Sequence, residues 1–85
     1  MVLTSKLKTL DDLIESLEYG MEIEFILYDV RYYIGWPEEI LRITWDNGYA
    51  EVLVEDNSIE TLLRTSFNGA NTIQDNWRDM EMIAY

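Results

Sequence analysis

The sequence predicts an α+β fold: an N-terminal helix, a four-stranded antiparallel meander of two hairpins, two short C-terminal helices and a candidate final edge strand. The first observation is a helical recurrence of apolar residues before Gly20 and again after Asn57. The second is the alternation of apolar and polar residues between these segments, which is typical of half-buried strands. With 85 residues, the chain is expected to form one compact domain over 1–85.

The first helix is predicted over residues 10–19. Its apolar face recurs at i, i+3, i+4 and i+7, through Leu10, Leu13, Ile14 and Leu17. Thr9 is the expected N-cap, with Asp12 three residues later, and Gly20 can adopt the left-handed conformation that ends a helix. Residues 1–8 show no periodicity, so we expect a flexible N-terminal segment.

Two hairpins are predicted to follow. In the first strand, Ile23, Phe25 and Leu27 face one way, and Glu22, Glu24 and Ile26 face the other. Asp29 and Val30 are the expected turn into a strand over 31–36, which Pro37 ends. Asn47-Gly48 is a preferred type I′ turn, and it is predicted to join strands over 40–46 and 49–54.

The C-terminal third carries two further helix signals. Asn57 and Glu60 have the spacing of a capping box before an apolar group of Ile59, Leu62 and Leu63. Thr72 and Asp75 repeat this spacing, and Ile73, Trp77 and Met80 then lie at i, i+4 and i+7. The tail 80–85 is the candidate edge strand.

The composition restricts the function. There are 17 acidic and 6 basic residues, for a net charge of −11, and no His or Cys. Direct nucleic-acid binding is disfavoured because such surfaces place Lys and Arg against phosphates. Without His or a thiolate, and with Lys6 and Lys8 as the only lysines, we expect no enzymatic activity, no cofactor and no metal site. Adjacent carboxylates such as Glu38 and Glu39 are interpreted as solvated charge.

The compartment is expected to be the cytoplasm. A small secreted domain is commonly stapled by disulfides, and this chain has no cysteine. Residues 1–10 lack the apolar core of a signal peptide, and no stretch approaches the roughly 18 apolar residues of a membrane span.

The acidic residues between 11 and 24 form the candidate site. On the predicted helix and the start of the sheet, an acidic ridge is expected to comprise Asp11, Glu15, Glu18, Glu22 and Glu24. Such a surface suits a basic protein surface, for example that of a nuclease or another DNA-handling enzyme, which it would engage by charge mimicry of nucleic acid.

The order of core and turn residues resembles that of known proteins. It runs from the helix Leu10 to Gly20 through Ile23, Phe25 and Tyr33 to Leu62-Leu63, Phe67-Asn68-Gly69, Thr72-Ile73, Trp77 and Glu81-Met82-Ile83. This order is similar to that of small uncharacterised acidic proteins of Gram-positive bacteria and their prophages. The resemblance implies a phage-related setting, such as inhibition of host defence, and brings no catalytic residues with it.

Two alternatives stay open. If Ile34 and Ile43 face the core, then Tyr32, Trp36, Leu41 and Trp45 face it too, and the outer face keeps Tyr33, Ile40 and Tyr49. That aromatic and apolar face could bind or sequester a small ligand, and arginines gathered beside it would favour an anionic one. The chain could also be a purely structural domain, and either a monomer or a homodimer is compatible with the sequence.

Overall fold

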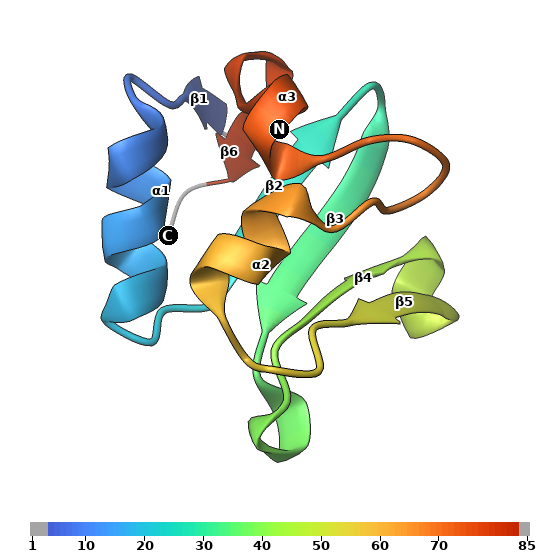
Figure 1. Ribbon diagram of the computed structural model, residues 1–85. Helices are drawn as coiled ribbons and strands as arrows, with labels where there is room; N and C mark the ends of the chain where they lie inside the picture. The colour runs from blue at the N-terminus through green and yellow to red at the C-terminus, as the bar shows by residue number, and fades with distance from the viewer. Residues whose placement is uncertain (1–3, 84–85) are drawn as a thin grey trace.

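The computed structural model describes residues 4–83 and arranges them as a six-stranded antiparallel sheet with three helices on one face (Figure 1). The strands are β1 (Thr4–Lys6), β2 (Ile23–Leu27), β3 (Val30–Gly35), β4 (Arg42–Trp45), β5 (Ala50–Leu53) and β6 (Glu81–Ile83). The helices are α1 (Leu10–Glu18), α2 (Ile59–Arg64) and α3 (Ile73–Asn76). Their order across the sheet is β1-β6-β2-β3-β4-β5, which confirms the predicted α+β class.

The predicted meander is present as β2 to β5. Asn47 and Gly48 have φ values of 55° and 88°, and the Tyr49 amide donates to the Asp46 carbonyl oxygen at 3.0 Å. Asn47 and Gly48 thus occupy the centre of the turn as predicted, but Asp46 also has a positive φ of 54°, and the connection between the paired residues Trp45 and Ala50 has four residues rather than the predicted two. The ladder pairs Trp45 with Ala50, so both strands are shorter than predicted.

The turn of the first hairpin lies one residue earlier than predicted. Tyr28 and Asp29, rather than Asp29 and Val30, have positive φ values of 49° and 66°, and Leu27 pairs with Val30. A β-branched residue such as Val30 is strained at positive φ, which disfavours the expected turn. The observed register also places Phe25 opposite Tyr32, where their rings stack with centroids 5.2 Å apart.

The two ends of the sequence meet in the sheet. Of the tail 80–85 predicted as an edge strand, Glu81–Ile83 form β6, but this strand lies between β1 and β2 and is not an edge strand. Residues 84–85 lie outside the described range. Thr4–Lys6, within the segment expected to be flexible, forms the edge strand β1 by pairing with Glu81–Ile83. A three-residue strand has no sequence period of its own, so only this long-range pairing defines it.

Helix α1 has the ends that its sequence predicts. The Thr9 hydroxyl accepts a hydrogen bond from the Asp12 amide at 3.3 Å. After the last turn, Gly20 has a φ of 79°, and its amide donates to the Leu17 carbonyl oxygen at 2.9 Å. The Met21 amide donates to the Ser16 carbonyl oxygen at 3.1 Å, which completes a Schellman motif.

The C-terminal helices differ from the prediction in their limits. The N-cap of α2 is Ser58, whose hydroxyl accepts from the Thr61 amide at 3.3 Å, and not Asn57, which has a φ of 54°. Thr72 caps α3 as predicted, and its hydroxyl accepts from the Asp75 amide at 3.2 Å. The α-helix then ends at Asn76, and a single 3₁₀ turn over Trp77–Asp79 leads into β6.

The core lies between the helices and the inner face of the sheet. The predicted inward positions Tyr32, Ile34, Leu41 and Ile43 are buried, and Trp36 and Trp45 pack against them with part of their surface exposed. Phe67, from the loop between α2 and α3, packs edge-on against Tyr32 with ring centroids 5.0 Å apart. The helices cover this side of the sheet, and we call the other, uncovered side the open face. Because side chains alternate along a strand, each strand residue points to one of these two sides.

Candidate functional site

Helix α1 carries four carboxylates on its exposed surface, and we call Asp11, Asp12, Glu15 and Glu18 the α1 carboxylates. They are exposed because Leu13 and Leu17 fix the opposite side of the helix in the core. The sequence of α1 contains no basic residue. Within residues 4–83, none of the three ion pairs involves an α1 carboxylate. This helix is therefore a concentrated negative surface without ion pairs in the described residues, and Lys6 and Lys8 line a cavity that Asp12 and Glu15 also line.

Glu22 and Glu24 lie on the opposite face of the sheet from α1. Because Ile23 and Phe25 point into the core beneath the helices, their neighbours Glu22 and Glu24 point to the open face. Glu24 is also compensated, since its carboxylate accepts a hydrogen bond from Arg31 Nε at 3.1 Å. The five residues of the predicted acidic ridge thus occupy two separate surfaces, with Asp11, Glu15 and Glu18 on one and Glu22 and Glu24 on the other.

The open face carries a nearly balanced set of charges. Beside the Arg31–Glu24 pair, Arg42 Nη1 lies 3.1 Å from the Glu51 carboxylate on the neighbouring strand. Tyr33 lies between these pairs, opposite Glu24 on one side and Thr44 on the other. Hydrogen bonding to the Glu22 carboxylate, followed by partial burial, raises the pKa of Tyr33 to about 12.

The alternative aromatic set does not form one site. Tyr33 lies at the centre of the open face, whereas Ile40 follows the β3–β4 turn and Tyr49, 88% exposed, follows the β4–β5 turn. A cavity of about 240 Å³ lies beside Tyr33, and its lining includes Arg31 and Thr44 but neither Ile40 nor Tyr49. The three residues therefore do not converge on a common ligand.

The arginines are dispersed as well. Arg31, Arg42 and Arg64 pair with three different glutamates, Glu24, Glu51 and Glu60. Arg78 lies over the ring of Trp77, 4.8 Å from its centroid. The two arginines of the open face, Arg31 and Arg42, are thus each engaged with a glutamate and do not form a cluster beside Tyr33.

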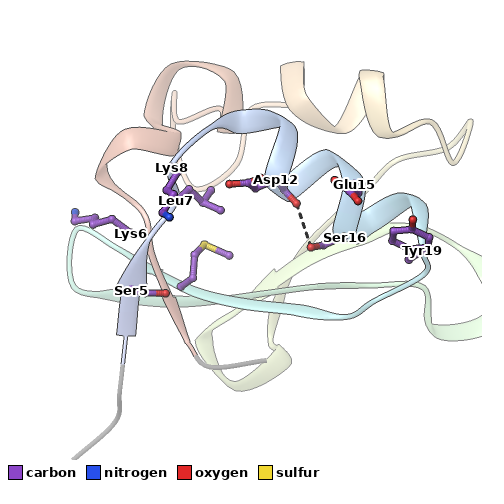
Figure 2. Close-up of a pocket in the computed structure, with 9 residues that line it drawn as sticks. Ser5, Lys6, Leu7, Lys8, Asp12, Glu15, Ser16 and Tyr19 are labelled. Atoms are coloured by element: carbon purple, nitrogen blue, oxygen red, sulfur yellow. Dashed lines mark hydrogen bonds between the residues drawn. The ribbon is translucent and has the colours of Figure 1, made fainter.

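The structure also shows a groove that sequence reasoning missed. It lies between β1 and α1 and has a volume of about 540 Å³ (Figure 2). We call it the β1–α1 groove, and its lining includes Ser5, Leu7, Asp12, Glu15, Tyr19 and Met82. The Ser16 hydroxyl, also in the lining, donates to the Asp12 carbonyl oxygen at 3.1 Å. No local pattern marks this groove, since β1 exists only through its pairing with β6.

The described residues were also searched for a metal site and for a membrane-spanning helix. Among residues 4–83, no group of three or more Asp or Glu side chains is arranged to hold a metal ion. None of the helices described in this range has the length and apolar character required to cross a membrane. The Tyr28 hydroxyl donates to the Asp79 carboxylate at 2.7 Å and accepts from Asn76 Nδ2 at 3.1 Å, which ties the β2–β3 turn to α3 and the 3₁₀ turn.

Comparison of the chain with protein-family models, with curated proteins and with solved structures finds no match.

Proposed function

We propose that this protein is a non-enzymatic binding or inhibitor protein whose α1 carboxylates engage the basic, nucleic-acid-binding surface of a partner protein. The partner is a nuclease or another DNA-handling enzyme. The acidic helix occupies the nucleic-acid-binding surface of this enzyme in place of nucleic acid. The observation that carries the proposal is the uncompensated charge of α1: four exposed carboxylates, no basic residue in the helix, and no ion pair to them within residues 4–83.

The spacing of these charges supports mimicry of a nucleic-acid strand. A helix of nine residues is roughly 13.5 Å long at about 1.5 Å per residue. Four carboxylates over that length give roughly one charge per 3.4 Å along the axis, which equals the axial spacing of phosphates in one strand of duplex DNA, about 3.4 Å. A cationic groove that follows one DNA strand would therefore meet a similar charge density along α1.

The distribution of charge over the molecule supports the same choice of surface. On the open face, Glu24 and Glu51 are paired with Arg31 and Arg42. Exposed ion pairs of this kind contribute only about 0–1 kcal/mol to stability, but they do cancel the local field. The α1 side keeps its field, which would steer a basic protein toward the helix and raise its association rate.

The resemblance to small acidic proteins of Gram-positive bacteria and their prophages supports a setting for this activity. In that setting, the protein acts in the bacterial cytoplasm during phage infection and inhibits an enzyme of host defence. The absence of cysteine is compatible with a reducing compartment.

The test is binding to a basic DNA-handling protein as a function of salt, charge and competing DNA. The purified chain is immobilised and exposed to lysate of a Gram-positive host, and captured proteins are eluted with increasing salt or with short duplex DNA. We expect basic nucleic-acid-binding proteins to be captured, to be lost as salt rises, and to be displaced by the duplex. Capture that neither salt nor DNA reduces would refute charge mimicry.

A matched pair of variants locates the contact. Asp11→Asn, Glu15→Gln and Glu18→Gln together remove three charges from α1, and Glu38→Gln, Glu39→Gln and Glu55→Gln remove three exposed charges elsewhere. The first triple variant is expected to weaken binding at least about tenfold, which corresponds to roughly 1.4 kcal/mol, and the second to have little effect. Equal effects of the two triple variants would mean that only net charge matters and would exclude α1 as the contact.

A further inference from the structure

We propose that the β1–α1 groove receives an extended basic segment of the partner protein, which adds to β1 as a further strand of the sheet. This inference rests on the proposed function and specifies the form of the partner: a segment in which Lys or Arg alternates with apolar residues. Three features carry it, namely the free edge of β1, the shape of the groove, and the position of its charges.

The first feature is the edge itself. Strand β1 pairs with β6 on one side, and no strand among residues 4–83 pairs with its other side. Thr4, Ser5 and Lys6 are all exposed. An edge strand presents unpaired amide and carbonyl groups, and an added peptide strand satisfies them with main-chain hydrogen bonds. At about 3.3 Å per residue, β1 offers roughly 10 Å of such an edge.

The second feature is the helix that runs beside this edge. Figure 1 shows α1 alongside the β1 end of the sheet, and Figure 2 shows Asp12, Glu15 and Tyr19 along the helix side of the groove. The buried Met82 belongs to the lining, and Tyr19, 77% exposed, lies at one end of the groove (Figure 2). A cleft of about 540 Å³ between a strand edge and a helix suits one extended segment with apolar side chains directed inward.

The third feature is the charge of the lining. Asp12 and Glu15 face the groove from α1 and take part in no ion pair within the described residues. Two lysines also belong to the lining, but the ammonium group of Lys6 donates to the Asp79 carbonyl oxygen at 3.3 Å and so points away from α1. Lys8 remains at the end of the groove beside the β1–α1 loop. The helix side is therefore acidic, and it selects Lys or Arg in the bound segment.

The charge pattern favours a partner segment over a second copy of this chain. Another copy would bring its own α1 carboxylates and a net charge of −11 to the same edge, and the repulsion would oppose association. A basic segment meets no such barrier.

The probe is a seven-residue peptide of alternating Lys and Val, acetylated at its N-terminus and amidated at its C-terminus. It is titrated into the full-length, isotopically labelled chain, and amide chemical shifts and hydrogen exchange are followed by NMR. We expect shifts centred on Thr4, Ser5, Lys6 and Leu7, with slower exchange of the outward-facing β1 amides. Shifts confined to the exposed surface of α1, with unchanged exchange in β1, would overturn the added-strand geometry.

Two controls separate main-chain pairing from charge attraction. A peptide of the same sequence with N-methyl groups at every residue keeps all its charges but loses the amide donors along both edges, and its affinity should fall at least about fivefold. A peptide with Glu in place of Lys should show no binding. Equal affinity of the methylated and unmethylated peptides would overturn the proposal, since charge alone would then account for binding.

Matched variants of the chain distinguish this inference from the proposed function. Asp12→Asn with Glu15→Gln removes two groove charges, and Asp11→Asn with Glu18→Gln removes two charges of α1 outside the groove lining. The first pair should weaken peptide binding at least about fivefold more than the second. If both pairs of substitutions weaken capture of the basic partner, but neither alters the response of the β1 amides to the peptide, the groove proposal fails and the proposed function stands. If the peptide protects β1 but α1 charges do not affect partner capture, the proposed function fails.

Discussion

The side-chain amide of Asn68 donates a hydrogen bond to the hydroxyl group of Tyr32 at 2.8 Å, across 36 positions of sequence. Tyr32 is 2% exposed and stacks on Phe25, so its hydroxyl is the polar end of a core side chain. Asn68 has a φ of 46°, a conformation that Asn tolerates better than most residues. This contact anchors the loop between α2 and α3 to the centre of the sheet.

Asn68→Gly should lower the free energy of unfolding by about 1–2 kcal/mol, because it removes the partner of the Tyr32 hydroxyl while Gly accepts the positive φ. Chemical denaturation measures the loss. Tyr32→Phe removes the same bond from the other side, and the double variant should be less destabilised than the sum of the two single variants. Simple additivity would show that the hydrogen bond contributes nothing.

The side chain of Asn57 bridges two segments that sequence reasoning did not connect. It accepts from the Leu41 amide at 2.8 Å and donates to the Glu39 carbonyl oxygen at 2.8 Å. Asn57→Ala should cost about 2–3 kcal/mol of unfolding free energy, since it leaves the amide of the buried Leu41 without a partner. Asn57→Asp keeps the acceptor and should cost less, so an equal loss for both variants would contradict this assignment.

Stability should fall in alkaline solution because of Tyr33. Its pKa in the folded chain is raised to about 12, above the ordinary value of 10.0, so the folded state holds the phenolic proton more tightly than the unfolded state does. The contribution to stability is complete below pH 10 and is lost as the pH rises from 10 through 12. Denaturation midpoints at several alkaline pH values measure this slope. Tyr33→Phe should flatten it, and an unchanged slope would assign it to other groups.

Gly35 allows the ring of Tyr33 to lie close to the sheet. A Cβ atom at position 35 would lie 2.9 Å from Tyr33 Cε1 and 3.6 Å from Glu22 Cγ, so Gly35→Ala should displace the ring from Glu22. We expect the pKa of Tyr33 to fall toward 10.0. Titration of the phenolate absorbance in the ultraviolet measures this pKa. The change in stability should be small, because replacing a strand glycine by alanine gains about 0.5–1 kcal/mol that offsets the displacement. A pKa that remains near 12 would mean that the ring keeps its place.

Asp56 should contribute to the loss of stability as the pH falls in acid solution. Its pKa is lowered because its carboxylate accepts hydrogen bonds from the Ser58 amide at 3.0 Å and then from the Thr61 hydroxyl at 2.9 Å. The stabilisation is present above the ordinary pKa of 3.8 and is lost as the pH falls through the lowered value. Asp56→Asn should make stability less dependent on pH below 4, whereas Asp75→Asn serves as a comparison. If stability depends on pH below 4 in the same way for Asp56→Asn and for the unchanged chain, this contribution is excluded.

Local patterns in the sequence determined the elements whose signals are short-range. Thr9 and Gly20 set the ends of α1 because caps act within one turn of the helix, and Asn47-Gly48 set a hairpin because few residue pairs tolerate two positive φ angles. Alternation alone grouped Tyr32 with Ile34, and Leu41 with Ile43, since neighbouring side chains of a strand point to opposite faces, but it did not determine which face is the core.

Only the tertiary structure decided how these elements are combined. Strand β1 and the internal place of β6 depend on pairing between residues 4–6 and 81–83, which no local pattern reports. The same packing separated the acidic residues: Leu13 and Ile23 share one core, so Glu15 and Glu24, only nine positions apart, lie on opposite sides of the sheet. The sequence thus determined the amount of negative charge, and packing determined that α1, unlike the open face, keeps it uncompensated within the described residues.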